Sequence, residues 1–177
     1  MNIISNTNYP FFYTATILEW KHLLKLDKYK QIIIDSLAFL CNQNKVKVYG
    51  FVIMPNHIHL IWQINSKYSL DKIQQSFMKY TAQQIKADLT INHPLVLEKF
   101  KVSAKDRKYQ IWERNPLSIQ LFSKEVLIQK LNYIHNNPYH EKWNIINQNG
   151  NYVYSSELFY NNLPHNFQFL THYNELF

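Results

Sequence analysis

Residues 51–62, FVIMPNHIHLIW, decide the fold. A Met-Pro-Asn turn separates two apolar runs, since proline and asparagine both favour turns. Side chains two residues apart on a strand point to the same face, so His57 and His59 project together, whereas the apolar residues that alternate with them project into a core. The stretch therefore predicts a buried hairpin that presents two imidazoles on one face of a sheet.

This histidine pair has two interpretations. Two neutral imidazoles on a rigid strand supply half of a metal site and leave positions for another ligand and a substrate oxygen. Alternatively, His57 and His59 are core or surface histidines that happen to alternate, which is the commoner origin of an isolated His-x-His match. The choice between the two depends on what the rest of the chain contributes.

Working outward from the hairpin, residue type and periodicity predict the helices and strands on either side of it. Aromatic and β-branched runs indicate strands, apolar residues at helical spacing indicate helices, and Ser69 is suited to cap a helix. Residues 89–106 look irregular. The expected elements are, in chain order, a strand over 11–18, a helix over about 28–44, strands over 45–53 and 57–64, a helix over 69 to about 88, and a strand over 108–114.

The order β-α-β-β-α-β is the ferredoxin-like pattern of an α+β fold. It predicts an antiparallel sheet with two helices on one face. Ser123 is suited to cap a third, C-terminal helix that ends at Pro138 and carries Tyr133. The length of 177 residues fits a single domain over residues 1–177.

The charge and aromatic content favour a nucleic-acid partner. Lys and Arg number 19 against 12 Asp and Glu, which gives a net charge of +7 and a pI near 9.3, and the chain holds 13 Tyr, 11 Phe and 4 Trp. Such a surface suits phosphates and stacked bases. Lys72, Lys79 and Lys86 recur every seven residues and so form one stripe on their helix. The alternative is a solvated helix face on a basic domain that binds nothing.

Several classes of protein are excluded by residue usage. Gly50 and Gly150 are the two glycines, too few and too far apart for a Rossmann fingerprint or a P-loop. Cys41 is the single cysteine, which excludes an internal disulfide and a cysteine-rich zinc module and agrees with a reducing cytoplasm. No apolar run is long enough to span a membrane, and residues 1–6 lack a secretory pattern, so a cytoplasmic protein is expected.

A second constellation lies on the third predicted helix. Tyr133 and Asn137 are four residues apart and therefore share a face, with Lys130 beside them. A phenol can attack a phosphodiester if a proton acceptor or positive charge offsets its free pKa of about 10. The amide oxygen of Asn137 is a hard ligand suited to Mg²⁺ or Mn²⁺. The alternative is that Tyr133 is a half-buried packing residue.

Two runs taken together resemble a known family. Residues 54–60, MPNHIHL, and residues 133–138, YIHNNP, are similar to motifs of the IS200-like transposases, and more closely to those of their REP-associated tyrosine transposase branch. Trp112 and the Tyr-Ser-Ser run at 154–156 agree as well. The resemblance covers roughly residues 8–160, and the paired motifs in this order are specific.

The resemblance implies a metal-dependent, single-strand DNA endonuclease and strand transferase of the HUH type. His57, His59 and Asn137 match the ligands of Mg²⁺ or Mn²⁺, and Tyr133 matches the nucleophile, which would leave a 5′-phosphotyrosine and a free 3′-hydroxyl. The implied substrates are hairpin or repetitive DNA, bound by a monomer or a homodimer. The basic residues proposed to contact DNA are Lys72, Lys79, Lys86, Arg114 and Lys130.

The chain departs from the family at two places. Leu117 stands where related sequences carry a histidine, and residues 139–143, YHEKW, are bulkier than the small residues usual there. His135 is two residues from Tyr133 and points away from it on a helix, so we interpret His135 as structural. Two alternative functions follow: a DNA-hairpin-binding protein without efficient cleavage, and a replication-initiator or relaxase-type nuclease.

Overall fold

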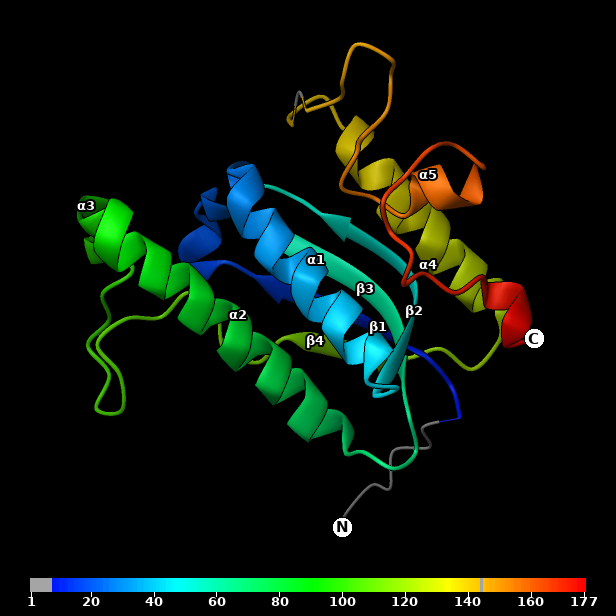
Figure 1. The fold of residues 1–177 in the computed structure, drawn as a ribbon, viewed down its shortest axis with the longest axis horizontal. Helices are drawn as coiled ribbons and strands as arrows, with labels where there is room; N and C mark the ends of the chain where they lie inside the picture. The colour runs from blue at the N-terminus through cyan, green and yellow to red at the C-terminus, as the bar shows by residue number, and fades with distance from the viewer. Residues whose placement is uncertain (1–7, 144) are drawn as a thin grey trace.

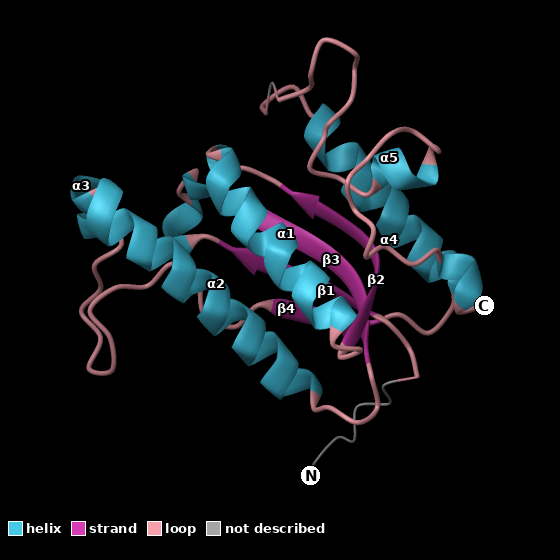
Figure 2. Ribbon diagram, in the orientation of Figure 1, coloured by secondary structure: helices cyan, strands magenta, loops and turns pink. Residues whose placement is uncertain are grey.

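The centre of the fold is a four-stranded antiparallel sheet with the strand order β2-β3-β1-β4 (Figures 1 and 2). The structure is a computed structural model and describes residues 8–177 except residue 144. The two inner helices follow β1 and β3, so the predicted ferredoxin-like α+β fold is confirmed. The strands are β1 (Phe11–Thr16), β2 (Val46–Ile53), β3 (His57–Ile64) and β4 (Leu117–Gln120).

Two long helices cover one face of the sheet. Helices α1 (Asp27–Asn42) and α2 (Leu70–Asn92) lie in front of the strands in Figure 1. Ser69 caps α2 as predicted, because its side chain accepts a hydrogen bond from the backbone N–H of Lys72. The core beneath the helices contains Ile58, Leu60 and Trp62 of β3, which are fully buried.

A third helix, α4 (Lys124–Asn136), packs on the opposite face of the sheet. Its buried residues pack in the same cluster as Ile61 of β3. The predicted cap at Ser123 is confirmed, because its side chain accepts a hydrogen bond from the backbone N–H of Val126. Gly50 lies beneath this helix, where an added Cβ atom would be 2.6 Å from Leu131 Cδ1 and would displace that side chain. A one-turn 3-10 helix, η3 (Asn137–Tyr139), follows α4 directly.

Short elements complete the chain. Pro94 begins α3, since proline is favoured in the first turn of a helix. Within the described residues, no helix is both long and apolar enough to cross a membrane. The short helical elements are η1 (Leu18–Trp20), η2 (Leu23–Lys25), α3 (Pro94–Glu98), α5 (Glu157–Tyr160) and η4 (Tyr173–Glu175).

The prediction for the fourth strand was wrong. Residues 108–114 make only isolated bridges, between Tyr109 and Lys101 and between Trp112 and Ile17, and the sheet continues at β4 instead. The reason is that the consecutive residues Ile111 and Trp112 are both buried, whereas an edge strand buries alternate residues. After this segment Asn115 adopts a φ of 59° and turns the chain into β4.

Other boundaries differ by smaller amounts. Helix α2 runs to Asn92 and α3 follows it, so the region expected to be irregular is partly helical. Strand β1 ends at Thr16 rather than Leu18, because the chain turns there into η1. Residues 1–6, expected to lack a secretory pattern, lie outside the described residues.

Candidate active site

The two histidines of β3 lie side by side on the face covered by α4. Their ring centroids are 4.8 Å apart, and both side chains are buried. The alternation of β3 puts them on this face, because Ile61 two residues further on packs under α4. The predicted projection of His57 and His59 to one face is therefore confirmed.

One nitrogen of each imidazole already has a partner. Nδ1 of His57 lies 2.7 Å from Oδ1 of Asn56, and Nδ1 of His59 lies 2.7 Å from Oγ1 of Thr14. The Asn56 amide is held in this orientation because its Nδ2 donates to the backbone carbonyl of Trp20. An amide oxygen only accepts, so Nδ1 of His57 carries the proton. Nε2 of His57 is then the ring nitrogen that can bind a ligand. The hydroxyl of Thr14 can donate or accept, so Nε2 of His59 can bind a ligand in the tautomer whose Nδ1 donates to Thr14.

Both histidines are held neutral. Burial lowers the pKa of His57 to about 4, and the nearby charge of Lys142 adds to the effect. Burial also lowers the pKa of His59 to about 3, with further contributions from His57 and Lys130. A neutral imidazole is the form that binds metal ions, so the pair is prepared for a cation at neutral pH.

Tyr133 of α4 lies beside this pair. Its ring centroid is 5.5 Å from that of His59 and 6.1 Å from that of Phe12, which itself stacks on His59. Half of the Tyr133 side chain is exposed, and Nζ of Lys130 lies 5.8 Å from its ring centroid. A solvent-accessible phenol, a cation and two imidazoles thus meet from segments far apart in the sequence.

Asn137 is buried one helical turn after Tyr133, at the start of η3. Among the described residues, no hydrogen bond joins its side chain to either histidine, and no cluster of three or more His, Cys, Asp or Glu side chains is arranged to hold a metal. Of the two helix residues predicted for the site, Tyr133 has a ring contact with the pair, whereas the Asn137 side chain has no hydrogen bond to it within the described part of the chain.

Two tryptophans flank His57. The ring centroid of Trp143 lies 5.8 Å from that of His57, and the centroid of Trp20 lies 6.1 Å from it. Glu19 and Trp20 both have left-handed backbone angles, with φ of 52° and 57°. For residues with a Cβ this conformation costs about 1–2 kcal/mol each. The bulky run at 139–143 thus brings one indole over the pair, and a strained turn brings the other.

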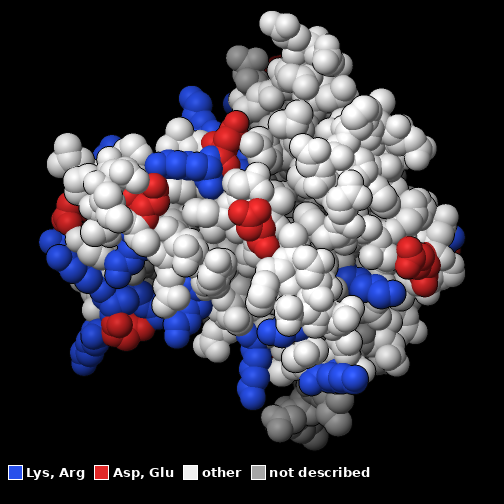
Figure 3. Space-filling view, in the orientation of Figure 1, with Lys and Arg blue, Asp and Glu red and all other residues white. Residues whose placement is uncertain are grey.

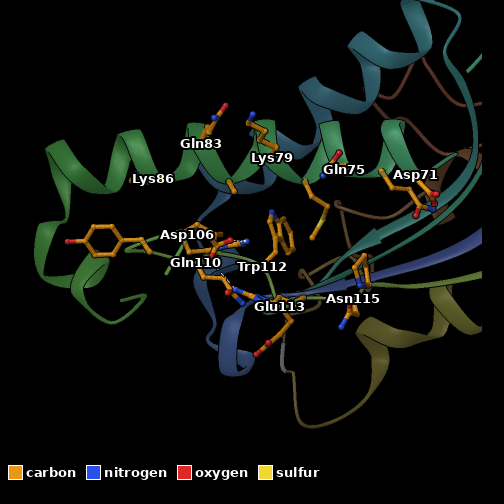
Figure 4. A pocket seen from close by; sticks show the side chains of 18 residues that line it. Asp71, Gln75, Lys79, Gln83, Lys86, Asp106, Gln110, Trp112, Glu113 and Asn115 are labelled. Atoms are coloured by element: carbon orange, nitrogen blue, oxygen red, sulfur yellow. Dashed lines mark hydrogen bonds and ion pairs between the residues drawn. The ribbon is translucent and has the colours of Figure 1, made fainter. Parts of the chain in front are cut away.

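A groove of about 910 Å³ lies away from the histidine pair, between α2 and residues 106–116 (Figure 4). Trp112 closes its floor by pointing towards α2, where its Nε1 donates to Oγ1 of Thr81 at 3.0 Å. Lys and Arg side chains gather on this side of the molecule, near α2, α3 and the loop that follows (Figure 3). The same view shows few charges over α4 and α5.

The groove collects three of the five basic residues expected to contact DNA. Lys79, Lys86 and Arg114 line it, together with Arg107. Asp106 pairs with both arginines, whereas Lys79 and Lys86 form no ion pair with any described residue. The other two expected residues lie elsewhere, since Lys72 does not line the groove and Lys130 lies at Tyr133.

Further residues near the site support α4. His135 lies 2.8 Å, through Nε2, from Oγ of Ser156, which bonds in turn to the backbone of Phe51. This contact agrees with a structural interpretation of His135. On the other side, Leu117 of β4 pairs with Thr14, which pairs with His59, so Leu117 extends the same row across the sheet.

The family model described as "Transposase IS200 like" matches residues 17–137, more than half of the chain. The chain belongs to the IS200-like transposase family. A transposase family comprises DNA-cleaving enzymes that generally use a divalent metal ion, so the function of this IS200-like protein is transposase-like action on DNA. A pair of neutral imidazoles, each of which uses Nδ1 for its hydrogen bond to another described residue, fits such an ion.

A solved structure of a related transposase shows the same fold. A REP-associated tyrosine transposase bound to a REP hairpin matches with a TM-score of 0.59 and 13% identity, over 84% of this chain and 76% of that chain. A crystal structure of a candidate transposase from Deinococcus radiodurans R1 matches with a TM-score of 0.47 and 14% identity, over 72% of this chain and 88% of that chain. None of the curated proteins matches.

The sequence did not indicate every residue that shapes the site. Thr14 reaches His59 only through the pairing of β1 with β3, and no local pattern reveals that register. Asn56 was interpreted as a turn residue, although its position directly before His57 could have suggested the contact. Trp20 follows a predicted strand that ends early, so its place beside His57 could not be foreseen.

Proposed function

We propose that this IS200-like protein is a metal-dependent nuclease and strand transferase that cuts single-stranded or hairpin DNA through Tyr133. The observation that carries the proposal is the contact of Tyr133 with His59, at 5.5 Å between ring centroids. The nucleophile and the histidine pair belong to the same chain. This supports a site that one copy of the chain completes by itself, and hence a functional monomer.

The proposed chemistry is an exchange of phosphodiester bonds. The phenolic oxygen of Tyr133 gives its proton to water and attacks the scissile phosphorus, the bond from phosphorus to the 3′-oxygen breaks, and the leaving 3′-oxygen takes a proton from water. The products are a 5′-phosphotyrosine and a 3′-hydroxyl. Attack by a 3′-hydroxyl on the phosphotyrosine reverses the step, so rejoining requires no nucleotide.

The residues around Tyr133 each have a task in this step. The positive charge of Lys130 stabilises the phenolate that forms as the proton leaves. Nε2 of His57, Nε2 of His59 and the amide oxygen of Asn137 would hold Mg²⁺ or Mn²⁺, which supplies charge that polarises the scissile phosphate. Asn56 and Thr14 keep the two rings oriented for that role.

The groove between α2 and residues 106–116 is the proposed contact surface for the DNA backbone. Lys79 and Lys86, which form no ion pair with any described residue, are seven residues apart on α2, which places them about 10 Å apart along the helix axis. The hairpin in the structure of the REP-associated relative supports hairpin DNA as the substrate class. The net charge of +7 is consistent with such a partner.

The decisive experiment is the capture of a covalent adduct. With Mn²⁺ and labelled hairpin DNA that carries single-stranded flanks, the wild-type protein should form a DNA adduct that survives denaturing electrophoresis. Tyr133→Phe should form none, while its affinity for the DNA stays within about twofold because the ring is retained. Tyr80→Phe is the matched control, since Tyr80 is similarly exposed and lies on α2.

A second candidate function is binding of DNA hairpins without efficient cleavage. The observation in its favour is Leu117, an exposed apolar side chain in the row of Thr14 and His59 where related sequences carry a histidine. Such a binder forms no adduct even in the wild-type protein. If the Leu117→His variant then acquires the adduct, the missing histidine is the cause.

A further inference from the structure

Trp20 is the most exposed aromatic side chain near the histidine pair. Its side chain is 61% exposed, and its ring centroid lies 6.1 Å from that of His57 with the rings at 67°. An exposed indole next to a polar pair offers a flat aromatic face on which another ring can stack. Among the described residues, His57 is the only ring that Trp20 contacts.

The backbone of Trp20 is held in an unfavourable conformation. Glycine or asparagine usually occupies positions with positive φ, yet here Glu19 and Trp20 adopt it consecutively. The turn is fixed from both sides. The backbone N–H of Glu19 donates to Oε1 of Glu113 at 2.6 Å, and the carbonyl of Trp20 accepts from Nδ2 of Asn56 at 3.2 Å. Strain of this kind persists only where the surroundings over-determine it, and it is frequent at ligand sites.

One amide connects the indole to the proposed metal site. Asn56 bonds the Trp20 carbonyl through Nδ2 and the His57 ring through Oδ1. The backbone that carries the exposed indole is thus tied to His57 through one planar group. A ligand that stacks on Trp20 would be placed in a defined position beside the histidine pair.

We propose that Trp20 is a base-stacking site, which takes one unpaired nucleobase of single-stranded DNA next to the phosphate that the histidine pair handles. The link to a reacting phosphate rests on the proposed function, whereas the stacking itself does not. An aromatic ring stacks any of the four bases, because each has a π-face, so the site holds a nucleotide in place without reading its identity. A base within a duplex is already stacked and would not fit.

A double-mutant cycle on protein and DNA tests the site. Trp20→Gly removes the indole and relieves the backbone strain, so the variant should fold with an unchanged or higher melting temperature. Its affinity is measured for an oligothymidylate of about 16 nucleotides and for an abasic strand of equal length, without divalent metal. Trp20→Gly should bind the oligothymidylate about tenfold more weakly and the abasic strand as tightly as the wild-type protein.

Two further variants sharpen the result. Trp20→Tyr keeps an aromatic face and should recover most of the lost affinity. Phe39→Ala removes an aromatic side chain of similar exposure from α1, away from the histidine pair, and should change neither affinity. Equal losses on both strands, or no loss on either, would overturn the stacking site.

The outcome is separable from that of the proposed nuclease. If the cycle gives the expected difference while the wild-type protein forms no adduct, the stacking site stands and the nuclease proposal fails. If the adduct forms and the cycle is flat, the nuclease stands and Trp20 has no role as a base platform.

Discussion

The two faces of the central sheet are built from the same strands and have become different surfaces. On the helix face, Ile58, Leu60 and Trp62 of β3 are sealed beneath α1 and α2. On the other face the same strand presents His57 and His59, and the single helix α4 leaves Tyr133 beside them half exposed. Alternation along one strand of eight residues therefore places a sealed core on one face and the proposed active site on the other.

The faces also differ in how they treat polar groups. On the helix face, Oγ1 of Thr81 accepts from Nε1 of Trp112, and the bond joins two buried side chains. On the face that carries His57 and His59, the hydroxyl of Thr14 is hydrogen-bonded to Nδ1 of His59. The first hydroxyl completes a core, whereas the second orients one of the proposed metal ligands. This difference can be tested by removing each hydroxyl in turn.

The largest effect is expected from Thr14→Val, which keeps the shape of the side chain but leaves Nδ1 of His59 without its partner. Loss of such an outer contact typically weakens metal binding by 10–100-fold. Titration of Mn²⁺ by calorimetry measures the change, and stability should fall by about 1–3 kcal/mol because Nδ1 of the buried His59 is left unpaired.

Thr81→Val is the matched control on the helix face. It leaves the buried Nε1 of Trp112 unpaired, which costs about 1–3 kcal/mol of stability, and it should leave Mn²⁺ affinity unchanged. Equal metal affinities for Thr14→Val and the wild-type protein would contradict the proposal that the Thr14 hydroxyl supports metal binding.

A smaller effect concerns pH, because the buried histidines His57, His59 and His135 all have a lowered pKa. In the unfolded chain each titrates near 6.5, whereas burial lowers the pKa of His135 to about 4 in the folded state. Between these values the unfolded state binds more protons. The free energy of unfolding should therefore fall as pH decreases from 6.5 towards 4.

His135→Gln isolates one term of this dependence. Removing one histidine should flatten the slope by about 1.4 kcal/mol per pH unit in that range. Urea unfolding at a series of pH values measures it. An unchanged slope would mean that His135 is as accessible to protons in the folded protein as in the unfolded chain.

The division between the faces could be foreseen from the sequence, because it depends on local alternation. A strand that reads His-Ile-His-Leu fixes which residues share a face, whatever the strand pairs with. The order of strands and helices and the caps at Ser69 and Ser123 are local features too, and all of them are found in the structure.

What the sequence could not reveal depends on pairing across the fold. The edge strand was expected at 108–114 because of apparent alternation, but tertiary packing buries Ile111 and Trp112 together and leaves the edge to residues 117–120. In the same way, the partner of His59 follows from the register of β1 against β3, and the strained turn at Trp20 follows from contacts with Asn56 and Glu113.

The smallest expected effect concerns DNA contact by the groove between α2 and residues 106–116. If Lys79 and Lys86 neutralise phosphates, the double variant Lys79→Gln/Lys86→Gln should reduce the slope of log affinity against log salt concentration by about 1 for each residue. The fraction of bound DNA that becomes covalently attached to Tyr133 should stay the same. Fluorescence anisotropy at several salt concentrations gives the slope.

Lys47→Gln/Lys67→Gln removes the same charge from exposed positions outside the groove and should lower the slope far less. Equal slopes for the two double variants would show that the overall charge of the protein, rather than the groove, attracts DNA. The face that carries His57, His59 and Tyr133 would then be the surface that positions the DNA.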